Sequence, residues 1–450
     1  MKEICKMPKN SSIVNRISFI GKNPLKFLSI VICQLSIVFL LSGCSLLGGN
    51  QNQQISLKYW GIWESSTTMS QVIADYKKIK PNVNITYEKR SPQLYRESLQ
   101  TQIENGKGPD IFTFHNTWPI MLKSNLAPAP ALIMTAKALK DNYYPVIYTD
   151  MKNSQQQVIG LPSGIDGLAL YWNKDIFNAA GILNPPATWQ ELSQDASLLT
   201  VRDSLGNIRT SGVALGTAGN IDSFSDILGL MIYQNGGDPK NPANKEGAES
   251  LEYYTTFAKG PSKVWDETLP SSTVAFAGGT LAMYFGQSWR AIDIKNANPL
   301  LNFEVAPVPQ LENGNTNWAS YWATGVSGKS QYTKEAWEFV KYLNDQQTLI
   351  NMYNEDSKSP GRFFGQPYPV KSMGEQLATD PIIGAYIIEA PTMLSFPMAS
   401  RTYDNGINDQ IIKAYEDAVN SVLQNGDATT ALDTVANNIK AIFAKYNSPK

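Results

Sequence analysis

The chain has 450 residues, and its 38 basic and 39 acidic residues leave a formal net charge of −1 at pH 7. This balance argues against a nucleic-acid-binding protein, because neutralising phosphates requires a basic face. With one histidine, His115, and three cysteines, Cys5, Cys33 and Cys44, we expect no metal site, no cofactor and no catalytic triad or thiolate.

The first 43 residues have the pattern of a secretory signal peptide. A basic head precedes the apolar stretch 27–41, and its basic residues are Lys2, Lys6, Lys9, Arg16, Lys22 and Lys26. The apolar stretch is shorter than the roughly 20 residues that a membrane-spanning helix needs. The run Leu41-Ser42-Gly43-Cys44 resembles a bacterial lipobox, which implies cleavage before Cys44 and a lipid anchor on this residue. An uncleaved signal anchor is the alternative interpretation.

Residues 44–54 are rich in Gly, Asn and Gln and predict a flexible tether. Strand and helix patterns then alternate, with predicted strands at 55–60, 83–87 and 110–114 and predicted helices at 67–80 and 94–104. Pro81 ends the first of these helices. This alternation within about 60 residues predicts βαβ units and a parallel sheet.

The same alternation resumes further along the chain. We expect strands at 167–172, 212–215, 280–285 and 303–308, and helices at 173–180, 189–199, 223–234, 407–423 and 432–446. Two segments rich in Pro and Gly, 160–167 and 306–309, have the composition of connections between two lobes. Ordinary surface turns would give the same composition. The length of the chain by itself favours two domains.

Several stretches resemble the extracellular solute-binding proteins of bacterial ABC sugar importers, the family of maltose-binding protein. The run Gly181-Ile-Leu-Asn-Pro-Pro-Ala-Thr-Trp189-Gln-Glu-Leu192 is similar to the family pattern G-x-x-x-P-P-x-T-W-x-E-L. The other stretches that carry the likeness, in chain order, are 58–64, 108–112, 161–175, 279–289, 303–309 and 334–339.

The resemblance implies an α/β fold with two lobes joined by a hinge, each a mostly parallel sheet flanked by helices. We expect one lobe to hold residues 55–164 plus 304–340 and the other 167–302 plus 345–446. It also implies a monomer on the outer face of the cell membrane, held there only by its lipid anchor. Its partners would be a carbohydrate and the permease subunits of an ABC importer.

Ligands of open α/β sheets bind beyond the carboxyl ends of the strands. A sugar offers an apolar C–H face for aromatic rings and hydroxyls for carboxylates, amides and guanidinium groups. The expected ligand residues are Trp63, Glu64, His115, Asn116, Asp166, Trp289, Trp318, Tyr321 and Trp322. Arg362 and Arg401 are expected either to clamp hydroxyls or to pair on the surface. We expect Trp60, Trp172, Trp189, Trp265 and Trp337 to be packing residues.

We therefore predict capture and delivery of a carbohydrate without bond chemistry. Three other hypotheses remain open at this point. The first is a secreted enzyme that cleaves glycans with paired carboxylates. The second is a surface adhesin or sensor with the same fold. The third keeps the fold but binds a polyamine, a metal chelate or a peptide in the cleft.

Overall fold

The computed structural model describes residues 54–447. The predicted signal peptide, Cys44 and the tether up to residue 53 therefore lie outside the described residues. Among the helices that it does describe, none is both long enough and apolar enough to cross a membrane.

The first sheet has the strand order β2-β1-β3-β12-β4, and β5 also pairs with β12. Its strands are β1 (Ile55–Gly61), β2 (Val83–Lys89), β3 (Ile111–His115), β4 (Leu126–Ala127), β5 (Leu161–Pro162) and β12 (Trp322–Ser327). β1 pairs in parallel with β2 and with β3, as the βαβ pattern predicts. β12 runs antiparallel to β3, β4 and β5.

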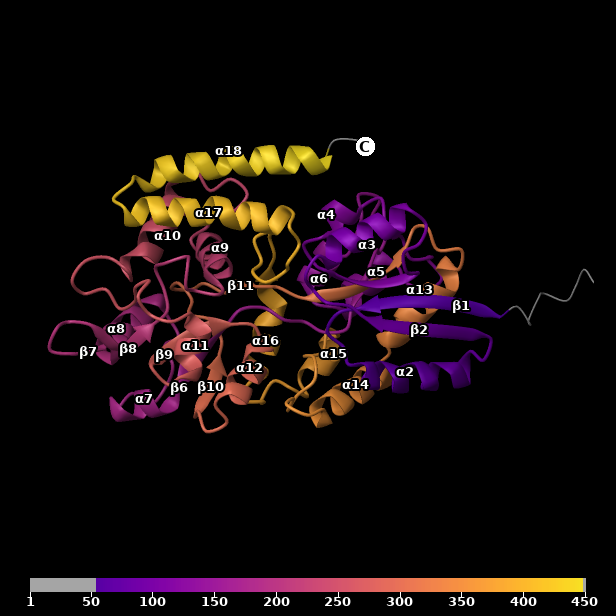
Figure 1. Cartoon of the computed structure of the whole chain (residues 1–450), viewed down its shortest axis with the longest axis horizontal. Helices are drawn as coiled ribbons and strands as arrows, with labels where there is room; N and C mark the ends of the chain where they lie inside the picture. The colour runs from indigo at the N-terminus through magenta and orange to yellow at the C-terminus, as the bar shows by residue number, and fades with distance from the viewer. Residues whose placement is uncertain (1–53, 448–450) are drawn as a thin grey trace, which may run out of the picture. The chain divides into compact units, whose positions relative to one another are not determined.

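Local sequence explains how the helices of the first lobe begin and pack. The hydroxyl of Ser65 accepts a hydrogen bond from the Thr68 amide and caps α2. Helix α2 packs on β2, and α14 packs on α2, on one side of β1 and β2 in Figure 1; α3 and α4 lie on the other side. The helices are α2 (Ser66–Ile79), α3 (Tyr95–Glu104), α4 (Pro119–Leu122), α5 (Ala136–Asn142), α6 (Pro145–Asp150), α13 (Thr333–Leu343) and α14 (Gln346–Lys358).

The second sheet has the strand order β10-β6-β9-β8-β7. Its strands are β6 (Ala169–Asn173), β7 (Val201–Arg202), β8 (Ile208–Val213), β9 (Leu281–Gly286) and β10 (Phe303–Ala306). Only β8 and β9 pair in parallel; the other neighbours in this sheet are antiparallel. Both sheets are thus mixed, whereas the sequence predicted mostly parallel sheets. Every antiparallel pair except β7–β8 involves β6 or β12, and each of these is the first strand after the chain enters the other lobe.

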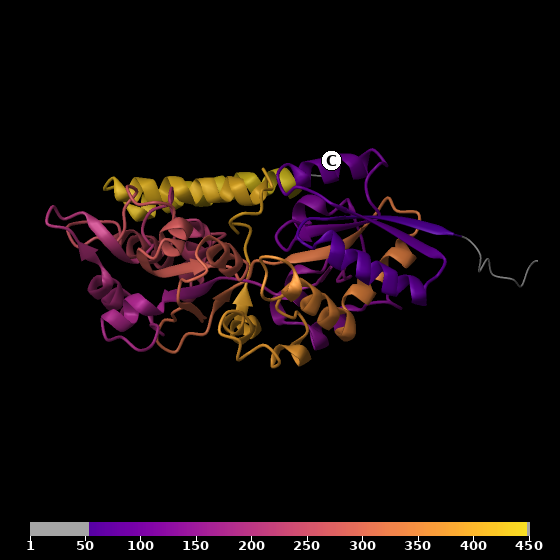
Figure 2. The same cartoon turned by 60° about the horizontal axis from the view of Figure 1, so that its bottom comes forward.

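The helices of the second lobe carry clear sequence signals for their starts. Thr188 and Glu191 form a capping box that begins α8 at Trp189, and Asn173 caps α7. Helices α17 and α18 lie side by side in Figures 1 and 2, and α18 packs on α10 and contacts α4. The helices are α7 (Lys174–Ala179), α8 (Trp189–Leu199), α9 (Phe224–Gln234), α10 (Lys245–Thr256), α11 (Ser272–Ala277), α12 (Arg290–Ala297), α16 (Gly384–Glu389), η2 (Ala390–Thr392), α17 (Ile407–Leu423) and α18 (Ala428–Asn447). Helix α15 (Lys371–Gly374) contacts the first lobe, since the Lys371 ammonium donates to the Lys140 carbonyl oxygen of α5.

Two boundaries of the expected lobes need correction. The expected first lobe resumes at residue 304, but β10 pairs with β6 in the second sheet. The expected second lobe resumes at residue 345, but α14 packs on α2 of the first lobe. Strand pairing and helix packing decide which lobe holds a segment, and neither can be read from the sequence alone. The assignment of the remaining chain to the lobes stays a prediction.

Two segments cross closely between the sheets. The first crossing is residues 163–168, between β5 and β6; the second crossing is residues 307–321, between β10 and β12. The Leu168 amide donates to the Trp318 carbonyl oxygen at 3.1 Å, and the Ser320 amide donates to the Asp166 carbonyl oxygen at 2.9 Å. Within the second crossing, β11 (Asn317–Trp318) pairs in parallel with β13 (Met393–Leu394). We call this region the hinge.

Candidate ligand-binding site

A cavity of about 330 Å³ is lined by residues of both lobes and of the hinge. This volume is within the range of small-molecule sites. The lining residues are Trp63, Glu64, Pro92, His115, Ser163, Gly164, Asp166, Gln287, Trp289, Ile292, Asp293, Ser320, Tyr321, Trp322, Arg362, Gln366, Ser400, Arg401 and Tyr403. We call this cavity the cleft.

The first lobe contributes an aromatic wall to the cleft. Trp63 follows β1 and Trp322 begins β12, and their rings meet edge to face with centroids 5.4 Å apart. The ring of His115, at the end of β3, lies 5.0 Å from Trp322. Burial lowers the pKa of His115 to about 3, so its imidazole is neutral and hydrogen-bonds to Thr117 and Ser320. This wall offers flat apolar faces and no positive charge from its histidine.

The opposite wall is built on Trp289, directly before α12. The guanidinium of Arg290 lies over its ring, 4.2 Å from the ring centroid, within the range of a cation–π contact. Asp166 in the first crossing holds Ser288, the residue before Trp289. Its carboxylate accepts hydrogen bonds from the Ser288 amide at 3.0 Å and from the Ser288 hydroxyl at 2.8 Å. Burial raises the pKa of Asp166 to about 7, and the hydrogen bonds from Ser288 and Gly167 oppose this rise.

Polar side chains complete the lining. Glu64 is 7% exposed, and burial raises the pKa of its carboxyl group. The Ser163 hydroxyl lies 3.5 Å from Glu64 Oε1, and Glu64 Oε2 has no hydrogen-bond partner among the described residues. Arg362 and Arg401 both line the cleft, and each also pairs with a carboxylate. The cleft thus combines indole faces with donors and acceptors.

Seven of the nine expected ligand residues line this cleft: Trp63, Glu64, His115, Asp166, Trp289, Tyr321 and Trp322. Their contact with a ligand stays a prediction. The other two expected residues do not line it.

Trp318 and Asn116 are used for packing and for the hinge instead. Trp318 is fully buried, donates from Nε1 to Asp226 at 2.9 Å and packs against Gly229 of α9. Asn116 donates to Asp150 at 2.9 Å and accepts from the Tyr321 amide at 3.1 Å. The neighbouring expected ligand residues Trp318 and Trp322 therefore do not share one surface, since Trp318 is buried in β11 while Trp322 begins β12 and lines the cleft.

Asp150 joins the hinge to the cleft. Its carboxylate accepts from Asn116, from the Tyr321 hydroxyl at 3.0 Å and from the Ser395 hydroxyl at 2.7 Å. Tyr321 also lines the cleft, and Ser395 directly follows β13. One carboxylate of α6 therefore connects the second crossing to the segments that follow β3 and β13.

Sequence reasoning missed several lining residues. Ser163 and Gly164 lie in the predicted first crossing, and Gln287 lies two residues before Trp289, so their neighbours gave a usable signal. Gln366, Ser400 and Tyr403 lie in irregular segments without periodicity, and no local pattern marks them. Their approach to the cleft depends on the tertiary fold.

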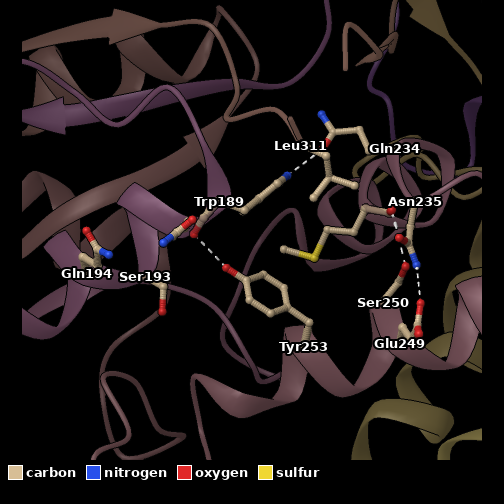
Figure 3. Close-up of a pocket in the computed structure, with 11 residues that line it drawn as sticks. Trp189, Ser193, Gln194, Gln234, Asn235, Glu249, Ser250, Tyr253 and Leu311 are labelled. Atoms are coloured by element: carbon tan, nitrogen blue, oxygen red, sulfur yellow. Dashed lines mark hydrogen bonds between the residues drawn. The ribbon is translucent and has the colours of Figure 1, made fainter. Parts of the chain in front are cut away.

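Another cavity, of about 500 Å³, lies among α8, α9 and α10 (Figure 3). Trp189 donates from Nε1 to Gln234 at 2.5 Å, and the Tyr253 hydroxyl donates to the Trp189 carbonyl oxygen at 2.8 Å. Trp189 is 5% exposed and stacks on Phe285, which confirms it as a packing residue; Trp60, Trp172, Trp265 and Trp337 are also buried. None of the expected ligand residues lines this cavity, and it lacks a wall from the first lobe.

Within residues 54–447, no group of three or more His, Cys, Asp or Glu side chains is placed to hold a metal ion.

Comparisons with known proteins agree with this architecture. Residues 61–348 match the sequence profile of the bacterial extracellular solute-binding protein family. The chain is 23% identical over 360 residues to a multiple sugar-binding protein of Streptococcus mutans, covering 75% of this chain and 80% of the relative. It is 26% identical over 293 residues to the sn-glycerol-3-phosphate-binding periplasmic protein UgpB of Yersinia enterocolitica, covering 59% of this chain and 65% of that relative.

Solved structures share the fold. An ABC transporter solute-binding protein from Thermotoga lettingae, bound with alpha-D-tagatose, superimposes with a TM-score of 0.64 at 22% identity. The alignment covers 86% of this chain and 100% of that protein. This likeness confirms the predicted two-lobed α/β fold.

Proposed function

Because the chain belongs to the bacterial extracellular solute-binding protein family, we propose that it captures a carbohydrate in the cleft and delivers it to an ABC importer. The main observation in support is that Trp63 and Trp322 of the first lobe and Trp289 of the second lobe line the same cavity. Polar groups surround these rings. This combination fits a guest with an apolar C–H face and a hydroxyl edge.

The relatives support this ligand class. One is a multiple sugar-binding protein, and a solved relative with the same fold holds tagatose. Binding without bond chemistry fits the family, so we propose that the ligand leaves unchanged.

The hinge supplies the mechanism in this proposal. A ligand that touches both lobes favours the arrangement in which both can reach it, and the lobes exchange between open and closed arrangements. The permease subunits of the importer would then recognise the closed arrangement. In this proposal the protein is a monomer on the outer face of the membrane, anchored by lipid on Cys44.

The test is a titration of the full chain, kept in mild detergent, with mono-, di- and oligosaccharides while tryptophan fluorescence is followed. Three indoles line the cleft, so a bound saccharide should give a saturable change in emission. Loss of one stacking face in Trp322→Ala should weaken binding roughly tenfold, or about 1.4 kcal/mol. Trp189→Phe, in the other cavity, is the matched control and should bind as the unmodified protein does. If no saccharide of the panel changes the tryptophan emission, the proposal is contradicted.

A further inference from the structure

The arginines at the cleft are already matched by carboxylates. Arg362 Nη2 lies 3.8 Å from Asp356 Oδ2, and Arg401 pairs with Asp222. Behind the ring of Trp289, Arg290 lies 3.3 Å from Asp293 and 3.9 Å from Asp222. None of these guanidinium groups therefore presents an unbalanced positive charge to a ligand.

Glu64 has no such partner. Among the described residues, no lysine or arginine nitrogen lies within the 4.0 Å ion-pair distance of its carboxylate. Asp166 is held only by neutral donors, namely the amide and hydroxyl of Ser288 and the amide of Gly167. Both side chains are 7% exposed. The unbalanced charge at the cleft is therefore negative.

We propose that Glu64, supported by Asp166, makes the cleft selective for uncharged saccharides over their anionic counterparts, such as sugar phosphates and uronic acids. This inference rests on the proposed function and assigns the charge class of its ligand. A hydroxyl donates a hydrogen bond to an ionised carboxylate, which is stronger than a bond between neutral groups. An anionic group at the same place is repelled, and because both carboxylates are buried this repulsion is screened less than at the surface.

The titration of the two carboxyl groups agrees with this selectivity. Burial raises the pKa of Glu64 and raises that of Asp166 to about 7. A nearby anion would raise both further, so an anionic ligand has to bring protons with it. An uncharged saccharide has no such cost. One relative, UgpB of Yersinia enterocolitica, is named for the anionic ligand sn-glycerol 3-phosphate, so a neutral ligand does not follow from the likeness alone.

The experiment compares matched saccharides by calorimetry on the full chain at about pH 8, above the pKa of Asp166. The pairs are glucose with glucuronate and glucose 6-phosphate, galactose with galacturonate, and maltose and mannobiose with their 6-phosphates. The neutral member of a bound pair should bind at least roughly tenfold more tightly. Glu64→Gln should reduce the ratio of the affinity for the neutral member to that for the anionic member roughly tenfold. Glu304→Gln removes the same charge in β10, outside the cleft lining, and should leave the ratio unchanged.

A second measurement needs no variant. Lowering the pH from about 8 to about 5 protonates part of the two carboxyl groups, so the preference for glucose over glucuronate, which stays ionised, should shrink. The charged and titratable groups that face Glu64 are Tyr59, Tyr87, Lys89, Tyr95, Asp356 and Arg362. Those that face Asp166 are Tyr171, Tyr386 and Glu389.

The outcomes separate the two proposals. Equal affinity for neutral and anionic members, or a ratio independent of pH and of Glu64→Gln, overturns the charge selectivity but leaves saccharide binding intact. Failure of every neutral and anionic saccharide to bind overturns the proposed function and this inference with it.

Discussion

Asp166 connects the first crossing to the wall of the cleft. Its carboxylate holds Ser288 through both the amide and the hydroxyl, and Ser288 precedes Trp289 in the chain. The sequence predicted a ligand contact for Asp166. The structure places it in the cleft lining and, in addition, gives its carboxylate a positioning role.

The raised pKa of Asp166 predicts a pH dependence of stability. The folded pKa of about 7 lies above the ordinary value of 3.8, so the folded state binds more protons between these values. The free energy of unfolding should therefore fall as the pH rises from about 4 to about 7, by at most about 1.4 kcal/mol per pH unit from this group. Asp166→Asn should flatten the fall, measured by urea unfolding across this pH range.

The interval between about pH 6 and pH 7 is the most informative for this test. Burial also raises the pKa values of Asp150 and Asp226, each to about 6. Below about pH 6, the free energy of unfolding of the Asp166→Asn variant therefore still depends on pH. Asp141→Asn is the control, because a hydrogen bond from Lys137 lowers the pKa of Asp141 and its effect lies at lower pH. An unchanged slope in Asp166→Asn would contradict the assignment.

At the scale of single residues, the rule for strand ends identified most of the aromatic lining. Trp63 and His115 lie at the ends of β1 and β3, where the parallel order of these strands brings them to one edge. The same reasoning failed for Trp318. Its burial depends on Gly229 and Asp226 of α9, some 90 residues earlier, and no local pattern reports such a contact.

Among the elements, the hinge depends on a close approach of two backbones. A Cβ atom at Gly167 would overlap the carbonyl oxygen of Trp318, in the second crossing. Neighbouring hydrogen bonds hold the crossings at this spacing, so neither backbone can move away without losing them. The glycine is therefore required here by space.

Gly167→Ala should lower the free energy of unfolding by about 1–3 kcal/mol, the usual cost of overpacking. Gly219→Ala is the matched control, since its nearest atom, Glu267 Oε1, lies 3.5 Å from the added Cβ. The control should change stability by no more than about 0.5 kcal/mol in the same urea titration. Equal stability of the two variants would show that the crossings can separate freely.

Helices and strands with strong periodicity were predicted well. The expected helix 189–199 is α8, and the expected helices 67–80 and 94–104 correspond to α2 and α3 with shifts of about one residue. None of the two-residue strands was predicted; β7 pairs with the neighbouring β8, whereas β4, β5, β11 and β13 pair with segments far along the chain. A strand of this length has no period of its own, and only pairing with another segment defines it.

For the whole molecule, the cleft between lobes predicts a change in compactness. Addition of the saccharide found in the fluorescence titration should reduce the radius of gyration in small-angle scattering, because a ligand that touches both lobes favours the closed arrangement. Trp322→Ala at the same saccharide concentration should compact less, since fewer molecules are occupied. An unchanged radius at saturation would contradict closure on the ligand.

The sequence by itself determined the alternation of strands and helices, the two-lobed α/β class and most of the aromatic and acidic residues at the cleft, because these follow from local periodicity, from the ends of strands and from motifs. Only the tertiary structure decided which lobe holds β10 and α14 and that Trp318 and Asn116 turn away from the cleft. It also decided that, among the described residues, the carboxylates of Glu64 and Asp166 have no cationic side chain within ion-pair distance. Those properties depend on contacts between residues far apart in the chain, and the distances that make them exist only after folding.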